Sequence, residues 1–161
     1  MQISNHNRGE LSNIFGRVRN GGTRPHQGWD LAAPVGAPVF SIASGIVCYV
    51  KEGGAYGLQV CIQFSRMKTG QMYMSSDTDL FAFYAHLASA CVVEGQLVSE
   101  GQQVGTVGQS GNAGFTPPHL HFEIRTRPNA GRGLRHRLDP GEVLGFDHLA
   151  CRDAFVCPVW E

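Results

Sequence analysis

Short apolar runs, separated by glycine and proline, alternate with polar stretches along most of the chain. The runs are short for helices, and valine, isoleucine and phenylalanine recur in them, which is typical of β-strands. They cover residues 39–43, 45–50, 58–64, 80–87 and 119–125. We therefore predict an all-β fold, mainly antiparallel β-sheet, with long loops and at most short helices.

The stretches between these runs predict loops. Residues 65–78 are polar and predict a longer surface loop, and residues 109–118 predict a loop that leads into the last strand. A short helix is expected over residues 140–144. Because neither a repeat nor a linker is evident, residues 1–140 are expected to form one domain, on which residues 141–161 pack as a C-terminal tail.

Composition narrows the class of protein. The 161 residues suffice for one domain with a real core. The 13 basic and 13 acidic residues cancel, so we expect no nucleic-acid partner. No apolar run is long enough to span a membrane, and the first residues lack the apolar stretch of a signal peptide. Prior removal of a signal, a non-classical or secretion-apparatus route and residence inside the cell all stay open.

Five cysteines are many for a reducing cytosol and few for a disulfide-built scaffold. Folding the hairpin about residues 54–55 places Cys48 opposite Cys61, at a Cα separation that a disulfide tolerates. Two small buried side chains are an equally good interpretation of this pair. A second disulfide, Cys151–Cys157, could close a loop near the C-terminus.

Two histidines, His119 and His121, alternate with apolar residues in the last predicted strand. Residues two apart on a strand share a face, so their imidazoles would lie side by side. Upstream, His26 and Asp30 lie in a turn marked by proline and glycine. One histidine of the pair would join them in a set of two nitrogens and one carboxylate. That set suits Zn²⁺ with its fourth position open, which is the catalytic pattern, and it predicts a zinc hydrolase.

Three motifs follow one another along the chain: His26-x3-Asp30, Tyr84-Ala85-His86-Leu87 and His119-x-His121. The glycine spacing in residues 28–39 and 98–108 and the final Leu138-Asp139-Pro140 accompany them. Together these features resemble the zinc metallopeptidases of family M23, the lysostaphin/LytM type, which cut peptide bonds in bacterial peptidoglycan. The similarity extends from Ile14 to Pro140, nearly the whole chain.

The resemblance implies an antiparallel β fold with a groove walled by loops. In the family pattern His26, Asp30 and His121 bind one zinc ion, and His86 and His119 are the catalytic histidines beside it. The implied function is a zinc-dependent endopeptidase that hydrolyses the peptide cross-links of peptidoglycan, with stem peptides as partners. Such an enzyme would act in the cell wall or periplasm of its own or a target cell, for example as a lysin or antibacterial effector.

Several questions stay open at this point. A non-catalytic, zinc-containing module that binds the wall or activates other hydrolases is an alternative, although five intact motif positions favour a catalyst. The family includes enzymes for glycine bridges and for cross-links between D-alanine and diaminopimelate. Five cysteines lean weakly toward a Gram-negative setting, where periplasmic disulfides are routine, and hence toward the second type. An immunity or inhibitor protein and the oligomeric state are not predicted.

Some residues near the motifs have two interpretations each. Glu123 either hydrogen-bonds an imidazole from the same strand face or is a surface carboxylate. A basic cluster is either a solvated face or a contact for stem-peptide carboxylates; it comprises Arg132, Arg135 and Arg137. Asn112 and Thr116, in the loop before His119, either contact substrate or shape the turn.

Overall fold

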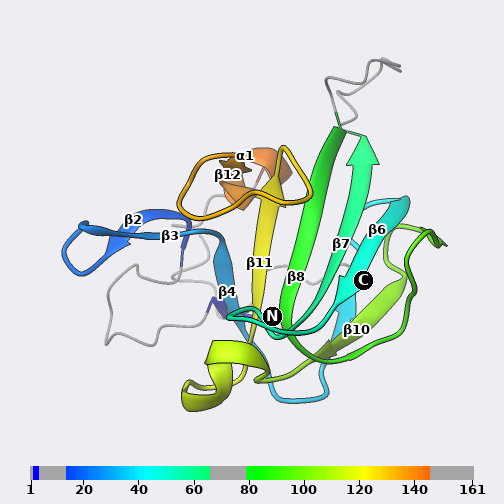
Figure 1. Ribbon diagram of the computed structural model, residues 1–161, viewed down its shortest axis with the longest axis horizontal. Helices are drawn as coiled ribbons and strands as arrows, with labels where there is room; N and C mark the ends of the chain where they lie inside the picture. The colour runs from blue at the N-terminus through cyan, green and yellow to red at the C-terminus, as the bar shows by residue number, and fades with distance from the viewer. Residues whose placement is uncertain (1, 4–13, 66–78, 146–161) are drawn as a thin grey trace.

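The computed structural model describes residues 2–3, 14–65 and 79–145 (Figure 1). Its strands are β1 (Gln2–Ile3), β2 (Gly16–Arg19), β3 (Arg24–His26), β4 (Trp29–Ala32), β5 (Pro38–Phe40), β6 (Gly45–Lys51), β7 (Leu58–Ser65), β8 (Asp79–Ala90), β9 (Leu97–Val98), β10 (Gln103–Val107), β11 (His119–Arg125) and β12 (Arg137–Leu138). Its helices are the 3-10 helix η2 (Gly111–Phe115) and the α-helix α1 (Pro140–Leu144). The predicted loop over residues 66–78, the predicted Cys151–Cys157 pair and residues 146–161 of the predicted tail lie outside the described residues.

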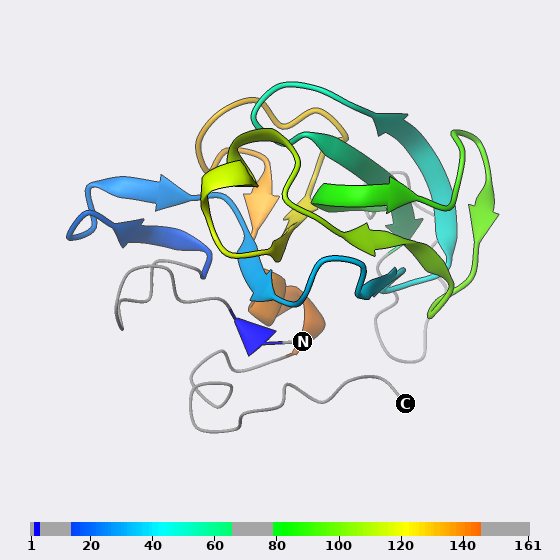
Figure 2. The same cartoon turned by 90° about the horizontal axis from the view of Figure 1, so that it is seen from below.

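Antiparallel pairing joins the strands of the main sheet in the order β1-β4-β11-β8-β7-β6-β9. β10 pairs with both β5 and β8, and β12 pairs with β11. β2 and β3 form a separate hairpin that projects from one side of the sheet (Figures 1 and 2). This arrangement confirms the predicted all-β, antiparallel fold. Within the described ranges, no helix has the length and apolar character needed to cross a membrane.

The period-two pattern of β11 gives its two faces different tasks. Leu120, Phe122 and Ile124 belong to the main hydrophobic core, where burying each side chain is worth roughly 1.5–3 kcal/mol. His119 and His121 alternate with them and therefore point to the opposite face. Every residue of β11 is buried. One strand thus anchors the core on one face and carries the predicted site residues on the other.

A β-bulge changes the predicted relation of Cys48 to Cys61. The pairing of β6 with β7 sets Val47 opposite Ile62 and Tyr49 opposite Cys61, so Cys48 is the extra residue of the bulge. Both cysteines are free thiols. The predicted direct opposition of the two residues is therefore wrong, because the prediction assumed an unbroken register. Cys48 still packs against Cys61, and a disulfide between them stays a prediction. Cys61 fits the alternative interpretation, since it is a fully buried small side chain.

The helix α1 occupies the predicted residues and begins the predicted tail. Asp139 caps its first turn by accepting a hydrogen bond from the backbone N–H of Gly141 at 2.9 Å. Val143 packs against the main core. The start of the tail is therefore part of the same folded unit, while the division into residues 1–140 and 141–161 stays a prediction.

Gly28 stands where the chain entering β4 comes closest to β11. A Cβ there would lie 2.1 Å from the backbone oxygen of Phe122, so one strand would have to move. We expect Gly28→Ala to lower the free energy of unfolding by about 1–3 kcal/mol, the usual cost of overpacking. Gly114→Ala is the matched control, because its Cβ would meet nothing closer than 3.8 Å. Equal denaturation midpoints for the two variants would contradict this account.

Candidate metal-dependent active site

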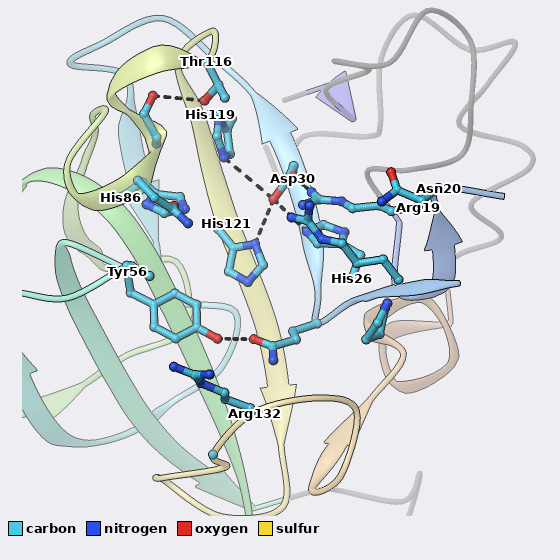
Figure 3. A pocket seen from close by; sticks show the side chains of 17 residues that line it. Arg19, Asn20, His26, Asp30, Tyr56, His86, Thr116, His119, His121 and Arg132 are labelled. Atoms are coloured by element: carbon cyan, nitrogen blue, oxygen red, sulfur yellow. Dashed lines mark hydrogen bonds and ion pairs between the residues drawn. The ribbon is translucent and has the colours of Figure 1, made fainter. Parts of the chain in front are cut away.

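Strand pairing brings the three predicted metal ligands together. β4 pairs with β11 so that Asp30 lies directly opposite His121, and His26 ends β3 just before β4. One candidate ligand atom from each residue lies within 4.8 Å of the other two, and all three residues are buried. Figure 3 shows the two imidazoles converging on the carboxylate of Asp30.

Hydrogen bonds at the outer nitrogens fix the tautomers of His26 and His121. His26 Nδ1 donates to the backbone oxygen of Ile14 at 2.9 Å, because a carbonyl oxygen can only accept. His121 Nε2 likewise donates to Glu123 Oε1 at 2.9 Å. Each neutral ring therefore turns an unprotonated nitrogen toward Asp30 Oδ1, at 3.1 Å from His26 Nε2 and 2.8 Å from His121 Nδ1.

This arrangement fits a bound cation. Two unprotonated nitrogens and a carboxylate oxygen are all electron-pair donors, so their close approach needs a positive charge between them. A proton on one ring or a divalent metal ion supplies that charge. Two imidazoles with one carboxylate are a donor set that Zn²⁺ prefers in catalytic sites. The residues present thus fit the zinc ion that the sequence predicted.

Before zinc binds, one proton is held by this ligand set. Burial disfavours the charged form of His121, but hydrogen bonds with Asp30 and Glu123 outweigh burial and raise its pKa to about 9. Burial lowers the pKa of His26. Burial also favours the neutral form of Asp30, yet its contacts with the two imidazoles, that with His121 before that with His26, keep its pKa well below the ordinary value. At neutral pH the proton therefore resides on His121.

His86 and His119 lie beside the ligand set without belonging to it. Their ring centroids are 5.1 Å apart, and His119 Nε2 lies 3.8 Å from Asp30 Oδ1. Each Nδ1 donates to a backbone oxygen at 2.9 Å, His86 to Ser110 and His119 to Pro117. In each neutral ring, Nε2 is therefore the proton acceptor. The structure thus places both predicted catalytic histidines next to the predicted metal position.

A β-bulge in β8 directs His86 toward this site. β7 pairs Val60 with Tyr84 but Leu58 with Leu87, so β8 has one residue more than β7 in this interval. His86 has a φ of 61°, in the left-handed region that costs a non-glycine residue about 1–2 kcal/mol. The sequence predicted a strand over residues 80–87, whereas β8 continues to Ala90.

The environment of His86 keeps its imidazole neutral. Burial is the largest cause, and the charges of His121 and His119 add to it, so that the pKa of His86 falls to about 4. The backbone N–H of His86 donates to the backbone oxygen of Tyr56 at 3.0 Å, which holds the bulge in place. At pH 7 the ring is therefore a fixed, uncharged proton acceptor.

Glu123 is fully buried, and its two oxygens accept four hydrogen bonds. Oε1 accepts from His121 at 2.9 Å and from the Tyr56 hydroxyl at 2.8 Å. Oε2 accepts from Nε of Arg125 and of Arg137, each at 2.6 Å. These partners outweigh burial and hold the pKa of Glu123 below its ordinary value. The interpretation of Glu123 as a hydrogen-bond partner of an imidazole is confirmed, and its interpretation as a surface carboxylate is wrong.

The predicted basic cluster divides into different environments. Arg137 is buried beside Glu123 and also donates to the backbone oxygen of Gly133 at 2.8 Å, so it is no part of a solvated face. The short strand β12 pairs with β11 and brings the Arg137 side chain to Glu123. The residues next to Arg137 in the sequence gave no sign of this burial. Arg132 and Arg135 are exposed, and Arg132 lines the groove described next.

A groove of about 860 Å³ surrounds the site, a volume typical of ligand-binding clefts. The β2–β3 hairpin contributes one wall, where Arg19 Nη2 donates to Asp30 Oδ2 at 2.8 Å. Figure 3 shows Arg19 on the opposite side of Asp30 from His86 and His119. The site is therefore open to a peptide-sized ligand rather than closed like a structural metal site.

The loop with η2 contributes a further part of the groove. Asn112 and Thr116 both line it, as a substrate contact requires. Thr116 Oγ1 also donates to the backbone oxygen of Ala113 at 3.0 Å, so it shapes the turn as well. Their contact with a substrate stays a prediction.

Sequence reasoning missed several groove residues, among them Arg19, Arg24, Gln27 and Tyr56. The Tyr56 hydroxyl contacts both Gln27 and Glu123, and its ring centroid lies 5.6 Å from that of His121. These residues lie in irregular or glycine-rich stretches with no periodic pattern. Only the pairing of distant strands brings them to the site, so no local signal could have found them.

The fold and the donor set are those of a metallopeptidase. Residues 24–135 match the model of peptidase family M23, and the chain belongs to this family. The predicted family and fold are thereby confirmed.

Individual relatives agree with this assignment. ShyA of Vibrio cholerae, a peptidoglycan DD-endopeptidase, is 38% identical over 106 residues, which make up 65% of this chain and 21% of ShyA. The catalytic domain of the antimicrobial peptidase lysostaphin from Staphylococcus simulans has a TM-score of 0.63 at 25% identity, over 84% of this chain and 91% of that domain. A zinc-containing peptidase from Vibrio cholerae has a TM-score of 0.58 at 30% identity, over 83% of this chain and 39% of its own. The chain thus spans about one fifth of the length of curated relatives such as ShyA and ShyB.

The left-handed backbone of His86 predicts that two substitutions at this position differ in stability. His86→Ala and His86→Gly both lose the imidazole and its hydrogen bond to Ser110, but only glycine adopts a φ of 61° without strain. We expect the glycine variant to be more stable than the alanine variant by about 1 kcal/mol in denaturant unfolding. At His119, in regular strand, the same pair should show the reverse order. Equal stability of the two His86 variants would refute the role of backbone strain.

Zinc binding should displace the proton of the ligand set. Since the pKa of His121 is raised to about 9, the ring is protonated at pH 7 and must lose the Nδ1 proton to bind metal. We expect zinc affinity to rise about tenfold per pH unit from about pH 6.5 to 8.5 and to level off above the pKa. Calorimetry in buffers of different ionisation enthalpy should detect the proton released from His121, to which ionisation of a zinc-bound water near pH 7 would add. Release of no proton would contradict the assignment to His121.

Proposed function

We propose that the protein is a zinc-dependent endopeptidase that hydrolyses the peptide cross-links of bacterial peptidoglycan. The observation that carries this proposal is the convergence, in one open groove, of a zinc-type ligand set with two histidines whose Nε2 atoms are proton acceptors. Membership of family M23 supports the reaction, the names of ShyA and lysostaphin support the substrate, and the zinc-containing peptidase supports the metal.

The chain holds the metal position rigidly. Zinc bound by His26, Asp30 and His121 would polarise the scissile carbonyl and acidify a water molecule. Arg19 fixes the second oxygen of Asp30, and Glu123 fixes the far side of His121. The ligands are therefore oriented before substrate arrives, which avoids a reorganisation cost during the reaction.

His86 and His119 are the proton carriers in this proposal. Hydrolysis of a peptide bond must move a proton from the attacking water to the leaving amine nitrogen. A neutral imidazole accepts this proton at Nε2, and the resulting imidazolium donates it to the amine. Because each Nδ1 is bound to a backbone oxygen, the transfer occurs only at the nitrogen that faces the groove. The low pKa of His86, about 4, makes its protonated form a ready donor.

The substrate would lie between the β2–β3 hairpin and the loop with η2. We assign Asn112 and Thr116 as contacts to the stem peptide, because they line the same groove as the catalytic histidines. The activity places the protein in the cell wall or periplasm of its own or a target cell. Delivery by a non-classical or secretion-apparatus route belongs to the same proposal.

A non-catalytic module that binds the wall or activates other hydrolases is the alternative. Such a module has no use for His86, whose bulged and left-handed backbone carries a cost in stability. Strain of this kind is typical of residues held in place for chemistry. The geometry of His86 therefore favours the enzyme over the binding module.

Substitution of His119 separates the two functions. We expect His119→Ala to lower cleavage of cross-linked muropeptides by about 10²-fold or more and to retain one zinc per chain, because His119 is outside the ligand set. His121→Ala should lose both zinc and activity. Purified sacculi of several wall types are digested, with a chelated sample beside them, and the products are identified by mass spectrometry. If zinc-loaded wild type leaves sacculi of every type intact, the proposed enzymatic function is wrong and the binding module remains.

A further inference from the structure

Positive charge is concentrated in the groove although the chain as a whole is neutral. The chain has 13 basic and 13 acidic residues. Among the described residues that line the groove, the cations are Arg19, Arg24 and Arg132, and the one carboxylate is Asp30. That carboxylate is already engaged by Arg19 and two imidazoles and serves the metal position. The excess of positive charge is thus local to the groove, and the carboxylate of the site does not neutralise it.

Arg24 and Arg132 provide this excess from different walls. Arg24 begins β3 in the projecting hairpin, and Arg132 lies between β11 and β12 and lines the same groove as Tyr56 (Figure 3). Both side chains are exposed, and neither forms an ion pair with a carboxylate among the described residues. Arg24 also pairs with Arg19 across the hairpin, so that two guanidinium groups of like charge lie on the same wall. An anion bound at this wall would relieve that repulsion.

The chemistry of cross-links tells which substrate such charges suit. In a bond between D-alanine and diaminopimelate, the carbon attached to the scissile nitrogen carries a carboxylate. In a glycine bridge the corresponding carbon carries two hydrogens and an uncharged peptide carbonyl, and no carboxylate. A guanidinium binds a carboxylate through two parallel charge-assisted hydrogen bonds, which makes arginine a selective reader of that group.

We propose that Arg24 and Arg132 form carboxylate-binding subsites that select diaminopimelate-type cross-links over glycine bridges. This inference rests on the proposed peptidase function and adds its specificity. The two arginines touch the non-reacting part of the substrate, so they determine which bond is presented to His86 and His119. Arg19 is excluded from this role because it holds Asp30.

The chain offers a matched control for each arginine. Arg17 lies in the same hairpin as Arg24, and Arg135 lies in the same connection as Arg132; both are exposed and outside the groove. The test compares R24Q and R132Q with R17Q and R135Q. Each zinc-loaded protein is assayed on purified D-alanyl–diaminopimelate muropeptide dimers with free carboxylates, on the same dimers with amidated diaminopimelate, and on pentaglycine-bridged dimers.

We expect wild type to prefer the free-acid dimer over the amidated dimer by about tenfold or more in kcat/KM, the effect of one charge-assisted hydrogen bond. R24Q and R132Q should each lose about tenfold on the free-acid dimer, mainly through KM, and little on the amidated dimer. The control variants should stay within about twofold of wild type. Preference of wild type for the glycine bridge, or equal losses on both diaminopimelate dimers, would overturn the subsites.

A binding measurement separates this inference from the proposed function. Uncleaved stem tetrapeptides, with free or amidated diaminopimelate, are titrated into the same proteins by calorimetry. If wild type cleaves nothing, the peptidase fails, but tighter binding of the free-acid peptide that R24Q and R132Q abolish would still support the subsites. Equal binding of the two peptides by wild type would overturn them whether or not the protein cleaves peptidoglycan.

Discussion

The groove depends on one constraint, the hydrogen bond that each imidazole makes from its far nitrogen. Three of the acceptors are backbone oxygens, those of Ile14, Ser110 and Pro117, and the fourth is the carboxylate of Glu123. Backbone oxygens neither rotate nor titrate, so the fold itself decides which nitrogen of each ring is unprotonated. Metal binding and proton transfer both need a nitrogen of that kind. Displacing a loop by a fraction of an ångström would therefore alter the chemistry without changing any site residue.

The site face of the sheet is held together by buried charges as well as by a small aromatic cluster, which comprises Tyr49, Cys61, Phe83 and Ala85. Arg125 joins Glu123 to the small aromatic cluster, with its guanidinium carbon 3.4 Å from the centroid of the Phe83 ring and Nη1 donating to the Tyr49 hydroxyl at 3.3 Å. Arg137 completes the same network. Buried ions are costly when alone and stable when each has partners, so this face tolerates its charges only as a set. The metal ligands rest on that set through His121.

The sequence predicted the elements that local pattern determines. The alternation in β11 gave the shared face of His119, His121 and Glu123, and the spacing of His26 and Asp30 gave the rest of the donor set. The four predicted site histidines and Asp30 converge in the structure. Local pattern carries this information because strand periodicity follows from the backbone alone.

What the sequence could not predict depends on register and on distant contacts. The bulges at Cys48 and His86 each insert one residue between paired strands, and only the partner strand reveals the insertion. The burial of Arg137 follows from a two-residue strand that sequence pattern cannot distinguish from a loop. In the sequence Tyr56 is only a residue of a turn, and its contact with Glu123 arises from the arrangement of the sheet.

The two-faced character of β11 also restricts how this protein can vary. Leu120 and Phe122 belong to the core, and the histidines between and beside them belong to the groove. Inserting or deleting a single residue within this strand would exchange the two faces from that point onward, sending imidazoles into hydrocarbon and hydrocarbon into the groove. Length changes can therefore accumulate in the connecting loops but not in this strand. The length of this strand therefore determines which side chains face the groove, and it matters for function as much as the histidines do.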